Sequence, residues 1–175
     1  DGKREILIGD ISDEKIYCYR PNGTLYSSFA FAAGFSAYDG LATANVDGDG
    51  RDEIIVADWS SSRIYVYGAS GTQLGWDDVD GGFGYWPRLL VGNPYGTGPR
   101  IIVAHGADHN QLYAYQWWAS SQQNPHGDLA APDTIPCEFN SGEGLAIADL
   151  QAIGGVLGAQ EILLANTWHT RVPGA

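Results

Sequence analysis

The feature that most constrains this chain is an internal repeat. Residues 1–10 (DGKREILIGD) align with residues 49–58 (DGRDEIIVAD) at an offset of 48 residues, and at the same offset residues 16–19 (IYCY) align with residues 64–67 (IYVY). A chain with this period is expected to form similar units that stack on one another, because one such unit cannot bury its own apolar surface.

Two further copies are weaker but keep the same order of segments. The third copy contains residues 100–104 (RIIVA) and 112–115 (LYAY). The fourth contains residues 144–149 (GLAIAD) and 161–166 (EILLAN), joined by a loop four residues longer than that of the second copy. We therefore place the repeats at about residues 1–29, 30–80, 81–130 and 140–175, of which the first and last are partial.

Each copy is predicted to form four short strands separated by turns. In the second copy, strands are expected over residues 41–46, 53–58 and 63–67, followed by a glycine turn and a fourth strand. The apolar run IIVA at residues 54–57 favours a strand covered on both faces. Four strands per repeat and no helical periodicity predict an all-β fold, a β-propeller with four-stranded antiparallel blades. A β-sandwich or a β-solenoid is the alternative.

The copies amount to a partial ring of about three to four blades, whereas closed propellers have about four to eight. Open blade faces would expose apolar area and unpaired strand edges. We therefore expect further blades, from the same protein or from another chain, to complete the ring. Residues 120–142, rich in Pro, Gln, Asn and Gly, are expected to form an extended loop between the third and fourth blades.

Residues 45–53 (NVDGDGRDE) form the clearest functional motif. Hard divalent cations need a converging set of six to eight oxygen ligands, and calcium tolerates an irregular set better than magnesium does. The motif predicts a Ca²⁺ site whose ligands are the side chains of Asn45, Asp47, Asp49 and Glu53 and the carbonyl of Arg51. The alternative is an acidic hairpin turn that binds no metal, although carboxylates held close together without a cation repel one another.

This motif resembles the calcium loops of FG-GAP repeats in integrin α-subunits and in many secreted bacterial proteins of the VCBS type. Those loops have the pattern Asp-x-Asp-x-Asp-Gly-x-x-Asp in a β-hairpin. Asn45 and Glu53 depart from it but remain oxygen donors. An EF-hand is excluded, because its last acid comes at position twelve and helices flank it. The resemblance implies a secreted or cell-surface propeller, stiffened by calcium, that acts in adhesion or as a scaffold.

Two other loops are weaker candidates for metal binding. Asp1, the carbonyl of Lys3 and Glu5 match the second half of the motif. In the fourth copy Asp149 and Glu161 keep the end positions, but Gln151 replaces an acid. The corresponding loop of the third copy has no acids and is expected to be free of metal.

The charge balance limits the classes of partner. The net charge is −12, which argues against nucleic acid and anionic membranes as partners, since both require a positive surface. No apolar run approaches the roughly 18 residues of a membrane span. The chain begins with Asp rather than Met, so we interpret it as a mature or trimmed fragment.

Two functions agree with the sequence. The first is a binding module whose loops contact a glycan or an extracellular protein, with Trp59 and Trp168 as the ligand-binding candidates because both follow a second strand, in loops. The alternative for these tryptophans is packing between blades, which also needs large side chains. The second is the propeller body of a polysaccharide-active enzyme, since similar calcium-bearing propellers form part of some rhamnogalacturonan lyases. No nucleophile elbow, phosphate loop or hydrolase-like acid pair is found, which favours binding over catalysis.

Overall fold

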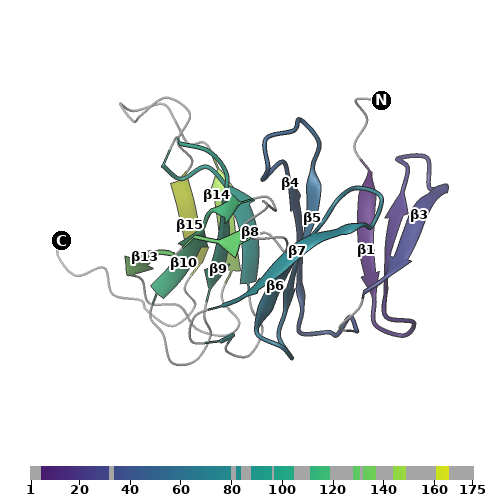
Figure 1. Ribbon diagram of the computed structural model, residues 1–175, viewed down its shortest axis with the longest axis horizontal. Coiled ribbons are helices and arrows are strands. Elements are labelled where there is room, and N and C mark those ends of the chain that lie inside the picture. Colours follow the sequence, from purple (N-terminus) through teal and green to yellow (C-terminus); the bar gives the residue numbers. More distant parts are fainter. Residues whose placement is uncertain are drawn as a thin grey trace.

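The computed structural model describes residues 5–31, 34–79, 82–83, 88–95, 97–104, 111–118, 128–130, 132–136, 144–148 and 161–165. Every regular element within these ranges is a strand, and every strand pair is antiparallel (Figure 1). These ranges contain no helix that is long and apolar enough to cross a membrane. The predicted all-β class is confirmed.

The first two sheets are simple meanders, in which each strand pairs with the next one along the chain. The first sheet consists of β1 (Ile6–Asp10), β2 (Lys15–Tyr19) and β3 (Leu25–Ala30). The second consists of β4 (Gly40–Ala44), β5 (Glu53–Asp58), β6 (Arg63–Tyr67) and β7 (Gln73–Asp78). By the repeat alignment β1 corresponds to β5, so the described part of the first sheet starts at the equivalent of a second strand.

The third sheet corrects one expectation from the sequence. It consists of β8 (Arg88–Gly92), β9 (Arg100–Ala104), β10 (Gln111–Tyr115) and β13 (Asp133–Pro136). Residues 120–142 were expected to be a loop, yet they contain β13 and β12 (Asp128–Leu129). The paired strands β11 (Trp117–Trp118) and β12 lie between β10 and β13 in the chain. The fourth strand of this sheet, β13, therefore comes later in the sequence than the repeat spacing predicts. A last pair joins β14 (Gly144–Ala148) to β15 (Glu161–Ala165).

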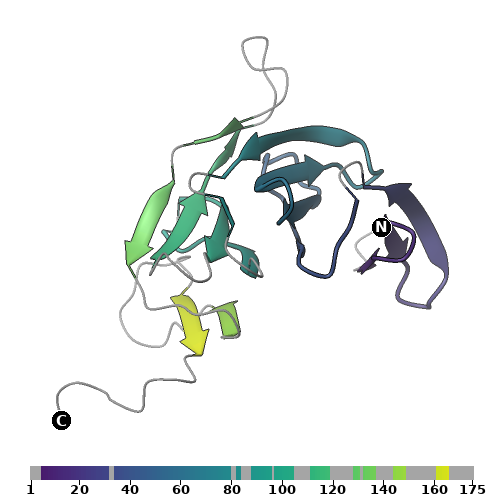
Figure 2. The same ribbon diagram turned by 90° about the horizontal axis from the view of Figure 1, so that it is seen from below.

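The sheets stand side by side along an arc (Figure 2). Strand β8 contacts β4 of the second sheet and β14 of the last sheet. The first strand of each of these sheets therefore adjoins the first strand of the next. Within the described ranges the row of sheets is open and closes into neither a barrel nor a ring.

Each sheet has two different faces. Strand pairing in the second sheet places the two tyrosines of β6 on the same side as alternate residues of β5. We call this side the tyrosine face, and its members are Ile54, Val56, Tyr65 and Tyr67. The opposite side, which we call the aliphatic face, consists of Ile55, Ile64 and Val66. All of these side chains are buried.

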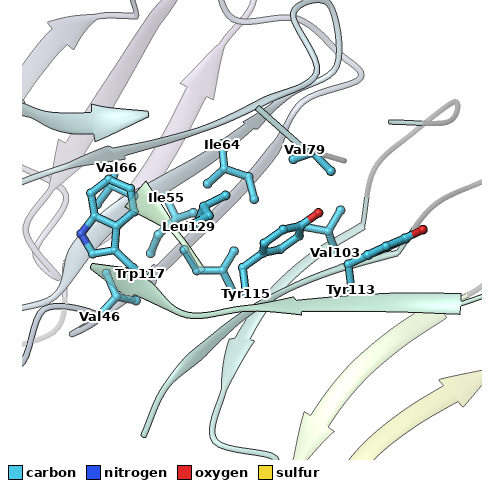
Figure 3. Close-up of a cluster of buried hydrophobic side chains, with 11 residues drawn as sticks. Val46, Ile55, Ile64, Val66, Val79, Val103, Tyr113, Tyr115, Trp117 and Leu129 are labelled. Carbon is cyan, nitrogen blue, oxygen red and sulfur yellow. The ribbon is translucent and has the colours of Figure 1, made fainter. Parts of the chain in front are cut away.

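Successive sheets stack with an aliphatic face against a tyrosine face. The tyrosine face of the second sheet packs against Leu7, Ile16 and Phe29 of the first sheet. Its aliphatic face packs against Val103, Tyr113 and Tyr115 of the third sheet, as Figure 3 shows. Together with Ile101, these residues form the tyrosine face of the third sheet. The row of sheets therefore has a direction.

The first two sheets also have equivalent turns, one between β2 and β3 and one between β6 and β7. The N–H of Gly23 donates to the carbonyl of Arg20 at 2.8 Å, and the N–H of Gly71 donates to the carbonyl of Gly68 at the same distance. These glycines have φ angles of +81° and +84°, and they are separated by the 48 residues of the repeat. Glycine is favoured there because other residues rarely adopt a positive φ.

The two glycines provide a matched test of sheet stacking. A Cβ atom on Gly71 would lie 2.5 Å from the ring of Phe29 in the neighbouring sheet, whereas one on Gly23 would meet no atom within 4 Å. Gly23→Ala should destabilise the fold by about 1–2 kcal/mol through backbone strain alone. Gly71→Ala should cost about 1–3 kcal/mol more, because it also overpacks the interface. Chemical denaturation measures both losses, and equal losses would contradict the stacking described.

Candidate metal site

The candidate site lies in the hairpin loop between β4 and β5. Strand β4 ends at Ala44, two residues before the predicted end at residue 46. The reason is a side chain from the far end of the loop: the N–H of Val46 donates to Glu53 Oε2 at 2.9 Å, and the N–H of Asp47 does so at 3.4 Å. The side chain of Glu53, the first residue of β5, therefore holds the start of the loop by hydrogen bonds.

The other polar side chains of the loop hold its backbone in consecutive tight turns. The N–H of Gly48 donates to Asn45 Oδ1 at 2.8 Å, and the N–H of Asp49 donates to Asp47 Oδ1 at 2.9 Å. The N–H of Arg51 donates to Asp49 Oδ1 at 2.7 Å. Because an oxygen of each of these side chains is fixed by a backbone donor, the carboxylates are oriented before any ion arrives.

Three of the predicted ligands lie close together. Carboxylate oxygens of Asp47, Asp49 and Glu53 all lie within 4.8 Å of one another. Two oxygens bound to the same calcium ion at about 2.4 Å can be at most about 4.8 Å apart, so the spacing of each pair is compatible with a shared ion. The donor set thus fits a hard divalent cation. Asn45 and Arg51, the other predicted ligands, lie in the same loop, Asn45 half-buried and Arg51 exposed.

The electrostatics of the loop favour a bound cation. Glu53 is only 3% exposed. Burial is the main cause that raises the pKa of its carboxyl, and the nearby charges of Asp47 and Asp49 raise it further, against the hydrogen bond from Val46. Within the described ranges the ion pairs are Lys15–Asp13 and Arg63–Asp78, both outside this loop. A cation would offset both the burial of Glu53 and the repulsion among the three carboxylates.

The loop is open to solvent on one side. Asp47 and Asp49 are exposed, and together with Glu53 they line a hollow of about 340 Å³. The other wall of this hollow comes from the β6–β7 turn and from Tyr26 of the first sheet. An ion can therefore reach the carboxylates without any rearrangement of the sheets.

The weaker metal candidates are only partly described. Asp1, Lys3 and Asp149 lie outside the described residues. Glu5 is exposed and directly precedes β1. Glu161 is the first residue of β15 and pairs with Ala148, as Glu53 is the first residue of β5 and pairs with Ala44. Of these residues only Glu5 has a described side chain, and within the described ranges it does not belong to a group of three or more possible metal ligands.

The loop of the third sheet contains a feature that the sequence analysis missed. Arg100 occupies the position that Glu53 has in the second sheet. Its guanidinium donates to the carbonyl of Pro99 and the hydroxyl of Thr97, each at 3.3 Å, and the N–H of Gly98 donates to Asn93 Oδ1 at 3.0 Å. This loop therefore carries its own fixed positive charge. The alignment already places Arg100 opposite Glu53, so this exchange of charge was detectable from the sequence.

The ligand candidate Trp59 lies at the opposite end of β5 from the metal loop. Its ring lies 5.3 Å from the ring of Tyr38, measured between centroids, and Tyr38 is 42% exposed. Asp39, which directly follows Tyr38, accepts hydrogen bonds from the backbone N–H groups of Trp59 at 2.9 Å and Ser36 at 2.7 Å. Tyr38 was not a sequence candidate, because it belongs to no strand pattern. Trp168, the other candidate, lies outside the described residues.

The turn beside Trp59 is held by a buried carboxylate. Asp58 is fully buried, and its two oxygens accept hydrogen bonds from the backbone and hydroxyl of Ser60 and from the hydroxyl of Ser61. In the first sheet Asp10 accepts the equivalent bonds from Ser12. The turn that presents Trp59 is therefore fixed by hydrogen bonds rather than by apolar packing alone.

Comparison with known proteins assigns the chain to no family. No protein-family model matches the chain, and no curated protein matches it significantly. What indicates a function is therefore the geometry of the residues themselves.

Substitutions at Glu53 separate its charge from its hydrogen bonds. In chelator, Glu53→Gln should unfold at the same temperature as the unsubstituted chain or higher, because the amide oxygen can still accept from Val46 and the repulsion with Asp47 and Asp49 disappears. Glu53→Ala should lose about 1–3 kcal/mol, because a buried N–H loses its partner. Thermal unfolding followed by circular dichroism measures both. If Gln destabilised the fold as much as Ala, the electrostatic account would be wrong.

Proposed function

We propose that this chain is part of a calcium-binding β-propeller of the FG-GAP type that serves as an extracellular binding module. The observation that carries this proposal is the convergence of Asp47, Asp49 and Glu53 in a β-hairpin loop. Their spacing in the sequence matches the calcium loops of that family. Their distances suit a single ion with about six to eight oxygen ligands.

The arrangement of the sheets supports the propeller part of the proposal. Propeller blades are antiparallel meanders packed face to face around a central axis, with their first strands innermost. Here β4, β8 and β14 are first strands in contact in succession, and the sheets follow an arc (Figure 2). The constant pairing of aliphatic face with tyrosine face is what a radial stack of similar blades requires.

The proposed role of calcium is structural. The ion would supply positive charge between the two ends of the β4–β5 loop. Asp47 and Asp49 would bind it from the exposed part of the loop, and Glu53 from the buried start of β5. The chain's own contribution is to orient these oxygens through the hydrogen bonds of Val46, Asp49 and Arg51. A bound ion would then stiffen the hairpin at the edge of the blade.

The proposed ligand surface lies at the other end of the same blade. Tyr38 and Trp59 present two neighbouring aromatic rings beside the polar loop of Asp39. Aromatic rings next to polar groups are well suited to stacking against sugar rings, so a glycan is the preferred ligand class. The net charge of −12 argues against nucleic acid as the partner. Location outside the cell follows from the family resemblance and is part of the proposal.

Calcium should stabilise the chain, and the effect should depend on the clustered carboxylates. At about a hundredfold excess over the dissociation constant, the expected gain is about 2.7 kcal/mol, or about 5–10 °C in the unfolding midpoint. Asp49→Asn should abolish most of this gain. Asp52→Asn is the matched control, because Asp52 is an exposed acid in the same loop but outside the cluster. The measurement is thermal unfolding with calcium, with magnesium and with chelator.

Two results would count against the calcium site. One is an unfolding midpoint that calcium leaves unchanged. The other is an equal loss of the calcium effect in Asp49→Asn and Asp52→Asn, since that would indicate general charge screening rather than coordination.

Glycan binding should depend on the aromatic pair. Trp59→Ala and Tyr38→Ala should each weaken binding to glycans found on an array by at least about tenfold, because each removes a stacking surface. Tyr95→Ala is the control, since Tyr95 is exposed to a similar degree, 39%, and lies in the third sheet's loop. Calorimetric titration with the best glycan measures the affinities. Equal affinities in the three variants would reject this surface as the binding site.

A further inference from the structure

The third sheet carries an insertion that the first two sheets lack. Tight turns join β2 to β3 and β6 to β7, whereas β11 and β12 lie between β10 and β13. Register places Trp117 of β11 opposite Leu129 of β12, so the two side chains share one side of this strand pair. Both are buried, and both belong to the cluster of apolar side chains between the second and third sheets.

The insertion reaches across to the second sheet. Strand β12 contacts β7, and the N–H of Leu129 donates to Asp77 Oδ2 at 3.0 Å. Within the insertion, the N–H of Ala130 donates to the carbonyl of Gln116 at 2.9 Å. The insertion therefore joins the two sheets both by apolar packing and by a hydrogen bond to a carboxylate.

The metal loop reaches the same cluster through Val46. The side chain of Val46 is buried in the cluster, and Ala44, at the end of β4, packs against it. Figure 3 shows Val46 beside Trp117 at one end of the cluster. The backbone N–H of the same residue donates to Glu53 Oε2 at 2.9 Å. Val46 therefore connects the core between the sheets to one of the clustered carboxylates.

We propose that the β11–β12 insertion sets the calcium affinity of the β4–β5 loop, with Trp117 as the positioning residue. Packed beside Val46, the ring fixes the Val46 backbone, whose N–H in turn orients the carboxylate of Glu53. A loop held in this way loses less conformational freedom when it binds an ion. This inference rests on the proposed calcium site and goes beyond it, because it assigns part of the affinity to the neighbouring sheet.

The ring of Trp117 acts through packing. Its indole N–H has no hydrogen-bond partner among the described residues, so the ring contributes apolar surface and shape rather than a polar contact. A phenyl ring can supply much of that surface. Any coupling between the insertion and the loop is also reciprocal: if the docked insertion favours the bound ion, the bound ion must favour the docked insertion.

The first test is calorimetric titration of the chain with calcium chloride. Trp117→Ala should weaken calcium binding at least about fivefold, because Val46 loses its support, and Trp117→Phe should keep most of the affinity. Tyr113→Ala is the matched control, since Tyr113 is a buried aromatic residue that Figure 3 shows at the other end of the same cluster. Its substitution should leave the affinity unchanged. Near-ultraviolet circular dichroism confirms that each variant is folded.

The outcomes separate this inference from the calcium site itself. An unsubstituted chain that binds no calcium would reject the site and the inference together. Calcium binding that Trp117→Ala leaves unchanged would overturn only the inference. Equal weakening by Trp117→Ala and Tyr113→Ala would also overturn it, because that result indicates a general loosening of the interface.

The second test uses the unsubstituted chain and so does not require a variant to fold. Because the coupling is reciprocal, calcium should slow amide hydrogen exchange at Leu129 and Ala130 at least about fivefold relative to chelator, as followed by nuclear magnetic resonance. The N–H of Phe31, which donates to the carbonyl of Glu14 in the first sheet, is the control and should slow less. Unchanged exchange at Leu129 would contradict the coupling. So would equal slowing at all three amides, which indicates general stabilisation of the chain.

Discussion

The structure depends on the burial of β5 from both sides. Ile54 and Val56 pack against the first sheet, and Ile55 packs against the third. Because the strand is enclosed along its whole length, the acids at its two ends, Glu53 and Asp58, are buried with it. Each of these carboxylates must then find donors, and each does so in the loop that it adjoins. The order of the metal loop and of the opposite turn thus follows from the stacking of the sheets.

This arrangement gives the two ends of one sheet different properties. At one end, the buried carboxylate of Glu53 lies close to the carboxylates of Asp47 and Asp49, and a cation would offset the repulsion among them. In the third sheet, whose corresponding loop contains no acids, the guanidinium of Arg100 donates to the carbonyl of Pro99 and the hydroxyl of Thr97. One loop therefore clusters three carboxylates, while its neighbour has a guanidinium at the position equivalent to Glu53. At the other end Asp58 accepts hydrogen bonds that hold the turn carrying Trp59, beside the proposed ligand surface.

The sequence predicted those parts of the structure that local pattern determines. Strands β5 and β6 have the predicted bounds, because an apolar run and an alternating run lie between clear turn signals. The carboxylates of the metal loop converge as their spacing indicated. Strand β13 was missed because its partner β10 lies far upstream and a Pro-rich composition hides it. The early end of β4 could not be foreseen, since it depends on a hydrogen bond from Val46 to a side chain seven residues later.

The central claim is that the carboxylates of the β4–β5 hairpin form one calcium site within a stack of similar sheets. The most direct test is anomalous diffraction from crystals grown in calcium. We predict a single strong peak in this loop, with oxygens of Asp47, Asp49 and Glu53 at about 2.3–2.6 Å from it. A loop without a peak at saturating calcium, or a peak bound by other residues instead, would contradict the account.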